Sequence, residues 1–179
     1  KNRSLRRVGR KNDMIEALKT LNQLKKIRIV KDYAIGGAHA LAYYLEPLVT
    51  YDLDVFVLIE TDHDFYALRS YLKRVKTRGV HTIIEDIPVH LLPGTLHPFI
   101  NEAVKTAKKI RIKGIGTKVL TVEYLIVSLL MAFRLKDRMA IPDLIEMANK
   151  KKLKSLVKKF SDERTPLNQR LRKVLESIQ

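Results

Sequence analysis

The chain has 179 residues, of which 46% are hydrophobic and 30% are charged, a balance typical of a folded globular protein. It contains no cysteine, which excludes disulfide scaffolds, thiolate zinc sites and cysteine nucleophiles. Its longest apolar run, residues 124–133, is about half as long as a membrane-spanning helix. No apolar stretch follows the basic N-terminus, so we expect no membrane contact, no secretory signal and a cytoplasmic location.

The excess of positive charge lies at the two ends of the chain. The 35 Lys and Arg residues outnumber the 19 Asp and Glu residues, which gives a formal net charge of +16. Residues 1–31 carry a net +9 and residues 150–179 a net +7, whereas residues 32–149 are neutral. Basic ends favour a nucleic acid, plausibly RNA, over a solvated surface without a partner. Both ends lack aromatic residues except for Phe160, so the expected contacts are to phosphates rather than bases.

In the first half of the chain, the predicted elements alternate between helices and strands. After a loose basic arm of residues 1–11, apolar residues at helical spacing (Ile15, Leu18, Leu21 and Leu24) predict a helix that starts at Asn12 or Asp13. The elements that follow are a strand at 33–35, a helix at 38–45 that Pro47 stops, a strand at 52–59, a helix from Asp62 or Asp64 to about Lys76, and a hairpin of strands 80–84 and 87–92 around Glu85 and Asp86.

The second half is predicted to be mainly helical. The expected elements are a helix at 98–108, short edge strands at 111–112 and 118–120, an apolar helix from Thr121 to about Lys136, a helix at 137–150 with Pro142 as a candidate for its true start, and amphipathic helices at 153–160 and 166–178. This order predicts a mixed α/β (α+β) fold. We expect a core of residues 12–120 and a helical C-terminal region, residues 121–179, that packs on it.

A glycine pair lies between the first predicted strand and the helix that follows it. Gly36 and Gly37 would let backbone N–H groups approach a phosphate at this point, and the helix N-terminus would add a favourable dipole. Taken alone, a glycine pair between a strand and a helix is more often a tight turn. The pair therefore indicates a phosphate site only in combination with a second feature.

The second feature is a pair of aspartates at the start of the next strand. Asp52 and Asp54 are two residues apart, so both carboxylates point to the same side of the strand. Like charges this close repel unless a cation lies between them, and magnesium is commonly held by carboxylates together with substrate phosphates. The alternative is a solvated pair at a strand end. Combined with the glycine turn, the aspartates favour metal-assisted nucleotidyl transfer.

Further segments extend these two motifs in a fixed order. They are residues 87–94 (IPVHLLPG), 102–104 (EAV), 121–125 (TVEYL) and 134–138 (RLKDR), with Asp143 and Leu144 after them. Together with residues 35–37 (IGG) and 52–55 (DLDV), the series resembles the DNA polymerase β-like nucleotidyltransferase superfamily. Within it, the series is most similar to the bacterial and archaeal branch that includes abortive-infection-type toxins. The resemblance covers about residues 33–147. It implies a small mixed sheet flanked by helices, followed by a helical C-terminal tail.

The resemblance also implies which residues form the site. Gly36 and Gly37 would face the triphosphate of an NTP, and Asp52 and Asp54 would be catalytic residues that hold Mg²⁺ or Mn²⁺. Lys136 or Arg138 would reach the phosphates of the nucleotide. The alternative for either cation is a structural ion pair with Asp137 or Asp143.

His90 marks a departure from the family pattern. Active members carry a third carboxylate on a later strand, and the matching position here is His90. Three alternatives remain open: His90 acts as a general base, since its unperturbed pKa lies near neutrality; Glu85 or Asp86 reaches in from the hairpin; or the site binds nucleotide without efficient catalysis. Direct coordination of magnesium by the imidazole is the least favoured role.

The other histidines carry weaker signals. His39 lies just after the glycine turn and is a candidate donor to a phosphate, whereas His63, His81 and His97 are predicted to be surface residues. The chain contains no HExxH, Walker or GxSxG motif, which excludes zinc-hydrolase, P-loop and α/β-hydrolase sites.

The sequence therefore predicts a magnesium-dependent nucleotidyltransferase that moves a nucleoside monophosphate from an NTP to a hydroxyl acceptor, plausibly RNA such as tRNA. A polycationic small-molecule acceptor is disfavoured because a protein of net charge +16 repels it. The alternative is a catalytically weak member that binds nucleotide or nucleic acid, with an antitoxin-like protein partner in a toxin–antitoxin pair. A third interpretation is a small α/β domain in which the two motifs are coincidental.

Overall fold

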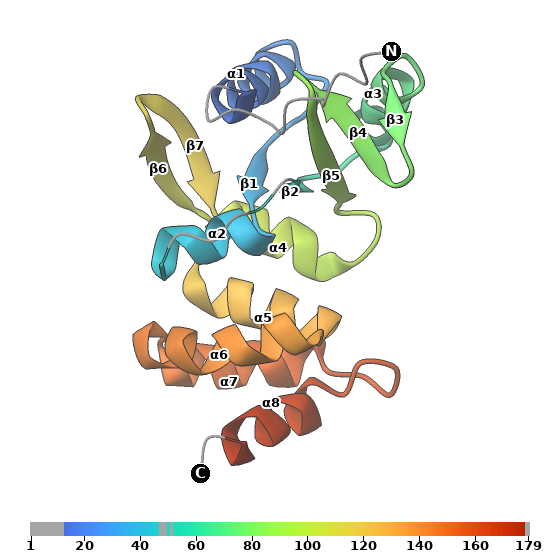
Figure 1. Cartoon of the computed structure of the whole chain (residues 1–179). Helices are drawn as coiled ribbons and strands as arrows, with labels where there is room; N and C mark the ends of the chain where they lie inside the picture. The colour runs from blue at the N-terminus through green and yellow to red at the C-terminus, as the bar shows by residue number, and fades with distance from the viewer. Residues whose placement is uncertain (1–12, 47–49, 51, 178–179) are drawn as a thin grey trace, which may run out of the picture.

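The computed structural model describes residues 13–46, 50 and 52–177, so the expected arm of residues 1–11 and the predicted stop at Pro47 lie outside the described residues. Over that part of the chain, the structure has seven strands in one mixed sheet and eight helices, the last four of which stack on one side of the molecule (Figure 1). This confirms the predicted mixed α/β fold. The strands are β1 Tyr33–Ile35, β2 Leu53–Val57, β3 Thr77–Arg78, β4 His81–Ile84, β5 Ile87–Pro93, β6 Lys108–Ile112 and β7 Ile115–Val119. The helices are α1 Asp13–Lys26, α2 Gly37–Tyr44, α3 Asp62–Leu72, α4 Pro98–Thr106, α5 Val122–Ala132, α6 Leu135–Met147, α7 Lys150–Phe160 and α8 Leu167–Glu176. None of the described helices is long and apolar enough to cross a membrane.

The strand order brings the two sequence motifs together. The sheet has the order β3-β4-β5-β2-β1-β7-β6. The central strands β1 and β2 are antiparallel, with Ile35 opposite Val55, so the start of β2 lies beside the end of β1. The glycine turn that follows β1 and the aspartates at the start of β2 therefore lie side by side, at the same end of these two central strands. β5 lies parallel to β2 on its other side, with His90 opposite Asp54.

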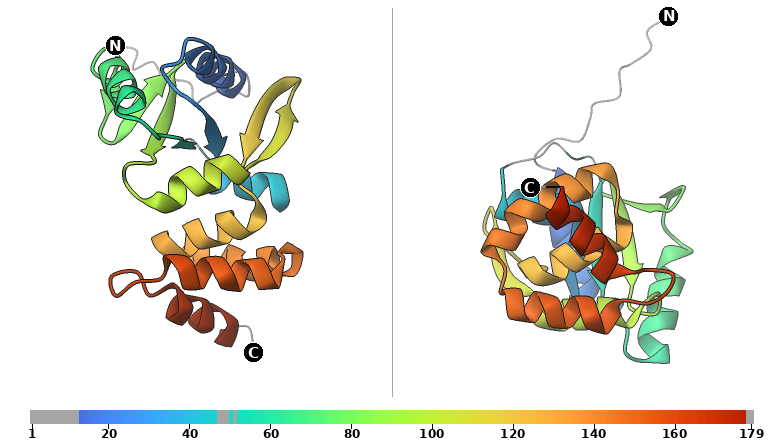
Figure 2. Two further views of the ribbon diagram at one scale, coloured as in Figure 1. Left: turned by 180° about the vertical axis from the view of Figure 1, so that it is seen from behind. Right: turned by 90° about the horizontal axis from the view of Figure 1, so that it is seen from below.

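The sheet separates two hydrophobic cores. Leu53 and Val55 of β2 belong to the core beneath α1 and α3, and Phe56 of the same strand belongs to the core shared with α2, α4 and the C-terminal helices, as the alternation of side chains along a strand requires. In the second core, α5 is buried along almost its whole length, and α6, α7 and α8 pack around it (Figures 1 and 2). The C-terminal helices thereby lie next to the strand ends at which Asp54 is found.

Three details of the predicted elements are wrong. The helix predicted at 121–136 ends at Ala132, because Phe133 adopts a left-handed conformation with φ 51° that an α-helix cannot continue through. The next helix, α6, begins at Leu135 and keeps Pro142 in its interior rather than at its start. β7 is not an edge strand, because it pairs with β1 on one side and with β6 on the other.

Candidate functional site

The glycine turn and the aspartate strand are in direct contact. A Cβ atom at Gly37 would lie 1.8 Å from Oδ2 of Asp54, and Gly37 has a φ of +54°, which favours glycine. The N–H of Gly36 donates to the carbonyl oxygen of Asp54 at 3.0 Å, and a Cβ atom there would lie 2.2 Å from the ring of Phe56. Both glycines are therefore needed for the strand to pack against the N-terminus of α2.

Asp52 lies beside Asp54 with a more open side chain. The side chain of Asp52 is 48% exposed and that of Asp54 is 23% exposed. Burial alone would raise the pKa of Asp52, but hydrogen bonds from the Thr50 hydroxyl, at 3.0 Å, and from its own backbone, together with the charge of Lys136, lower the pKa overall. Asp52 is therefore ionised at neutral pH, the state in which a carboxylate binds a cation.

Each aspartate is paired with a histidine of the β4–β5 hairpin. Nδ1 of His90 lies 3.2 Å from Oδ1 of Asp54, and Nε2 of His81 lies 3.6 Å from Oδ2 of Asp52. The two imidazole rings are 5.6 Å apart between centroids. His81, which was predicted to be a surface residue, is 28% exposed, and the hairpin register brings it near His90, so that both line the same cavity. The register of the hairpin can be counted from the two-residue turn at 85–86.

The hairpin turn cannot supply the missing carboxylate. The turn at Glu85 and Asp86 lies at the end of the hairpin away from His90, and both residues have positive φ angles, 49° and 62°. Glu85 instead accepts a hydrogen bond from the hydroxyl of Thr20 in α1, at 3.1 Å. Of the three alternatives for the third position, the geometry removes the one in which Glu85 or Asp86 reaches in.

The two aspartates open into a cavity of about 1030 Å³ between the sheet edge, α2 and α6. Gly37 and Ala38 line its wall at the N-terminus of α2. Leu41, Leu45 and Leu129 give it an apolar side. Its apolar wall and its charged lining, which includes Glu46 and Asp143 besides the two aspartates, suit a small molecule with both apolar and charged groups.

The start of α6 contributes cations to the cavity. Lys136 and Arg134 both line it. Nε of Arg134 lies 2.7 Å from Oδ2 of the buried Asp137. This hydrogen bond raises the pKa of Arg134, and the charges of Asp54 and Asp52 raise it further. The prediction did not select Arg134, although it begins the quoted segment of residues 134–138.

Two other predicted site residues do not line the cavity. Arg138 is absent from the residues that line the cavity, and its guanidinium lies over the ring of Phe133 at 5.4 Å. His39 lies in α2 but does not line the cavity either. Burial lowers the pKa of His39, and its Nδ1 has no hydrogen-bond partner among the described residues. The charges of Asp54 and Asp52 oppose this shift in pKa, so His39 lies close to the two aspartates although it does not line their cavity.

The comparisons with known proteins support this architecture at the level of the fold. No family model matches the chain and no curated protein matches it. Solved structures do match it, including the following two. An antigenic nucleotidyltransferase-like protein from Paracoccidioides brasiliensis is 18% identical with a TM-score of 0.53, over 87% of this chain and 91% of that chain. The antibiotic-resistance factor ANT(2'')-Ia, solved in solution, is 14% identical with a TM-score of 0.53, over 82% of this chain and 90% of that chain.

The chain has a nucleotidyltransferase-type fold. This confirms the fold that the resemblance implied. Neither solved structure bears on the abortive-infection branch, which stays a prediction. The identities are too low to carry an activity or a substrate from those proteins to this one, so the chemistry of this chain has to be argued from its own cavity.

The carboxylates that line this cavity fit a hard divalent cation. Among the described residues, no group of three or more His, Asp or Glu side chains is arranged to hold a metal ion. Two neighbouring carboxylates remain, and Mg²⁺ is commonly held by one or two carboxylates with substrate phosphates and water as the other ligands. Asp52 and Asp54 thus suit a cation that arrives together with a nucleotide.

Proposed function

We propose that the protein catalyses nucleotidyl transfer. It binds an NTP with Mg²⁺ or Mn²⁺, transfers the nucleoside monophosphate to a hydroxyl group and releases pyrophosphate. The observation that carries this proposal is the packing of the Asp54 carboxylate against Gly37, with Asp52 in the same cavity. This contact supports the proposal, because two neighbouring carboxylates would hold a cation and the adjacent helix N-terminus would favour a phosphate.

The cavity offers several groups for the triphosphate. The backbone of Gly37 and Ala38 lies at the positive end of the α2 dipole, and the side chains of Arg134 and Lys136 face the same cavity. The bound cation would neutralise the triphosphate and the departing pyrophosphate. The apolar wall at Leu41 and Leu129 would leave room for the nucleoside.

His90 is the proposed general base. Since Asp54 is a carboxylate, Nδ1 of His90 donates to it, and the lone pair of Nε2 is left free. The acceptor hydroxyl would give its proton to Nε2 while its oxygen forms a bond to the α-phosphorus. The bond from that phosphorus to the bridging oxygen breaks, and pyrophosphate leaves. Asp54 would then hold the imidazole in the productive orientation, as the acidic member of a catalytic triad does.

RNA is the proposed acceptor. The charge excess at the ends of the chain supports it, and α7 presents Lys151, Lys154 and Lys158 on its more exposed face. The antitoxin-like partner and the toxin–antitoxin role stay predictions, as does the cytoplasmic location.

A second candidate function is nucleotide binding with little turnover. The His90–Asp54 contact favours it, because an imidazole occupies the position at which active members of the superfamily carry a carboxylate. The two candidates share the binding step and differ only in the transfer step.

The binding step is tested first. Asp52→Asn and Asp54→Asn each remove one charge and keep the side-chain shape. We expect each to weaken the binding of MgNTP at least tenfold, about 1.4 kcal/mol, in isothermal titrations with the four NTPs. Asp62→Asn, at the exposed first turn of α3, is the matched control and should bind as the parent does. If Asp54→Asn binds MgNTP as tightly as the parent, the site assignment is wrong.

A further inference from the structure

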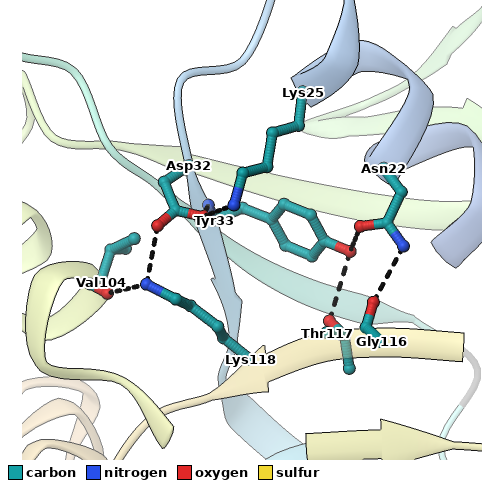
Figure 3. Close-up of polar contacts among 8 residues, drawn as sticks. All are labelled: Asn22, Lys25, Asp32, Tyr33, Val104, Gly116, Thr117 and Lys118. Carbon is teal, nitrogen blue, oxygen red and sulfur yellow. Dashed lines mark hydrogen bonds and ion pairs between the residues drawn. The ribbon is translucent and has the colours of Figure 1, made fainter. Parts of the chain in front are cut away.

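A second cavity lies between α1, the start of β1 and the β6–β7 hairpin (Figure 3). It has a volume of about 480 Å³ and shares no lining residue with the cavity at Asp52 and Asp54. Its polar and charged lining consists of Asn22, Lys25, Asp32, Tyr33, Lys109, Arg111, Thr117 and Lys118, with the backbone of Gly116. We call this cavity the α1–β7 groove.

A network of neutral hydrogen bonds fixes the inner wall of the groove. The Tyr33 hydroxyl donates to Oδ1 of Asn22 at 2.9 Å and accepts from the Thr117 hydroxyl at 3.2 Å. Nδ2 of Asn22 donates to the carbonyl oxygen of Gly116 at 2.9 Å (Figure 3). These bonds join α1, β1 and β7, so the groove is held in shape before any ligand arrives.

The groove is strongly positive. Among the described residues that line it, Asp32 is the one that is acidic, and Lys25 and Lys118 each lie 2.7 Å from it (Figure 3). Burial would raise the pKa of Asp32, but these two lysines lower it overall, so the carboxylate stays charged and already has two cations. Lys109 and Arg111 are exposed and form no ion pair with any described residue, although Nη1 of Arg111 donates to the carbonyl oxygen of Gly114 at 3.3 Å. Four cations against one carboxylate leave the lining with a net charge of +3.

The two exposed cations, Lys109 and Arg111, lie one after the other along a strand. Lys109 and Arg111 are two residues apart on β6, which is the edge strand of the sheet, so they lie about 7 Å apart along it. Gly116 is opposite Arg111, and a Cβ atom at Gly116 would meet nothing within 4 Å. The space over its backbone is therefore open to a ligand. Tyr33 is only 2% exposed, so its ring offers no face for a base to stack on.

We propose that the α1–β7 groove binds the phosphodiester backbone of RNA. A row of cations along an edge strand suits successive phosphates, and the lack of an exposed aromatic ring among the described lining residues suits contacts to the backbone rather than to bases. This inference extends the proposal that RNA is the acceptor of the reaction. Only the biological role of the groove rests on that proposal. The charged residues of the groove lie between positions 25 and 118 of the chain. Most of them belong to residues 32–149, a segment that has no net charge.

The test is a binding titration without NTP or divalent metal, so that its outcome is separate from that of the active site. A fluorescein-labelled RNA of about 20 nucleotides, long enough for several phosphate contacts, is titrated with protein, and anisotropy is followed at several salt concentrations. The variant Lys109→Glu/Arg111→Glu is compared with Lys73→Glu/Arg74→Glu, which changes the net charge equally at exposed positions after α3. We expect the groove variant to bind at least tenfold more weakly than this control, with a salt dependence smaller by about two phosphate contacts.

A single substitution tests whether RNA occupies the open space over Gly116. Gly116→Glu directs a carboxylate into open space and is expected to keep the melting temperature, and it should weaken RNA binding at least fivefold more than Gly116→Ala does. Equal affinities for the two charge-matched double variants would overturn the proposal. Complete competition by millimolar inorganic phosphate or pyrophosphate would also overturn it, because the groove would then be a site for small phosphate compounds. Equally tight binding of poly-glutamate would do the same by showing a general polyanion surface.

Discussion

Gly37 is the residue at which the first strand, the second helix and the aspartate pair meet. Its positive φ turns the chain from β1 into α2, and its lack of a side chain leaves the space that the Asp54 carboxylate occupies. These are two separate requirements. The backbone requirement is shared with Gly79, whose φ is +62°, but a Cβ atom at Gly79 would have no neighbour within 4 Å.

The substitution Gly37→Ala separates these requirements when it is compared with Gly79→Ala. A left-handed alanine costs about 1–2 kcal/mol at either position, and the clash with Asp54 should add about 1–3 kcal/mol at Gly37 alone. Gly37→Ala should also weaken MgNTP binding, since Asp54 has to move. Urea denaturation gives both free energies of unfolding. Equal losses for the two variants would show that the Gly37–Asp54 contact is not tight.

The residues of the site could be predicted from the sequence only where their motif was local. Gly36, Gly37, Asp52 and Asp54 lie in two short segments, and the structure brings those segments into contact. His81 was missed because its position depends on two pairings: the β4–β5 register and the placement of β5 next to β2. The first could be counted from the turn, whereas the second depends on how the whole sheet assembles.

At the scale of elements, α8 is joined to the end of α5 by one arginine. Nη1 of Arg170 donates to the carbonyl oxygens of Leu130 and Met131 at 2.8 and 2.7 Å, and its guanidinium lies over the ring of Phe133 at 5.1 Å. The last carbonyls of a helix lack intrahelical partners and carry partial negative charge. Arg170 therefore caps a buried helix from a neighbouring one.

The substitution Arg170→Met should destabilise the protein by about 1–3 kcal/mol, because it leaves carbonyl oxygens near the end of α5 without their donor. Arg172→Met is the matched control, since Arg172 is exposed on the same helix. Thermal melts of the two variants measure the difference. A melting temperature of Arg170→Met equal to that of Arg172→Met would mean that α8 is held by its apolar contacts alone.

Helices and strands with a clear hydrophobic period could be predicted, but some of their ends could not. The spacing of Leu18, Leu21 and Leu24 gives α1, and all three are buried. The break between α5 and α6 has no such local signal, because phenylalanine rarely adopts the left-handed conformation of Phe133. Contacts of its ring with Arg138 and Arg170 accompany that conformation, and they depend on helices that come later in the chain.

At the scale of the whole molecule, folding brings together charged residues that are far apart in the sequence. The local charge of each site therefore differs from the net charge of the segments that form it. The cavity at Asp52 and Asp54 contains further carboxylates, Glu46 and Asp143 among them, whereas the α1–β7 groove has a net charge of +3. The two sites have no residue in common. An RNA held by the groove and by the basic C-terminal helices would have to present its reacting hydroxyl at the acidic cavity, where a bound cation lowers the repulsion.

Label transfer tests the central claim most directly. The protein is incubated with Mg²⁺, each α-labelled NTP in turn and total cellular RNA, alongside Asp52→Asn, His90→Ala and the control Asp62→Asn. We predict label on RNA with the parent and with Asp62→Asn, none with Asp52→Asn, and at least a hundredfold less with His90→Ala, since a general base contributes about 10²–10⁴-fold. If no acceptor of any kind carries label although MgNTP still binds, the result would contradict nucleotidyl transfer. The site would then be a nucleotide-binding site.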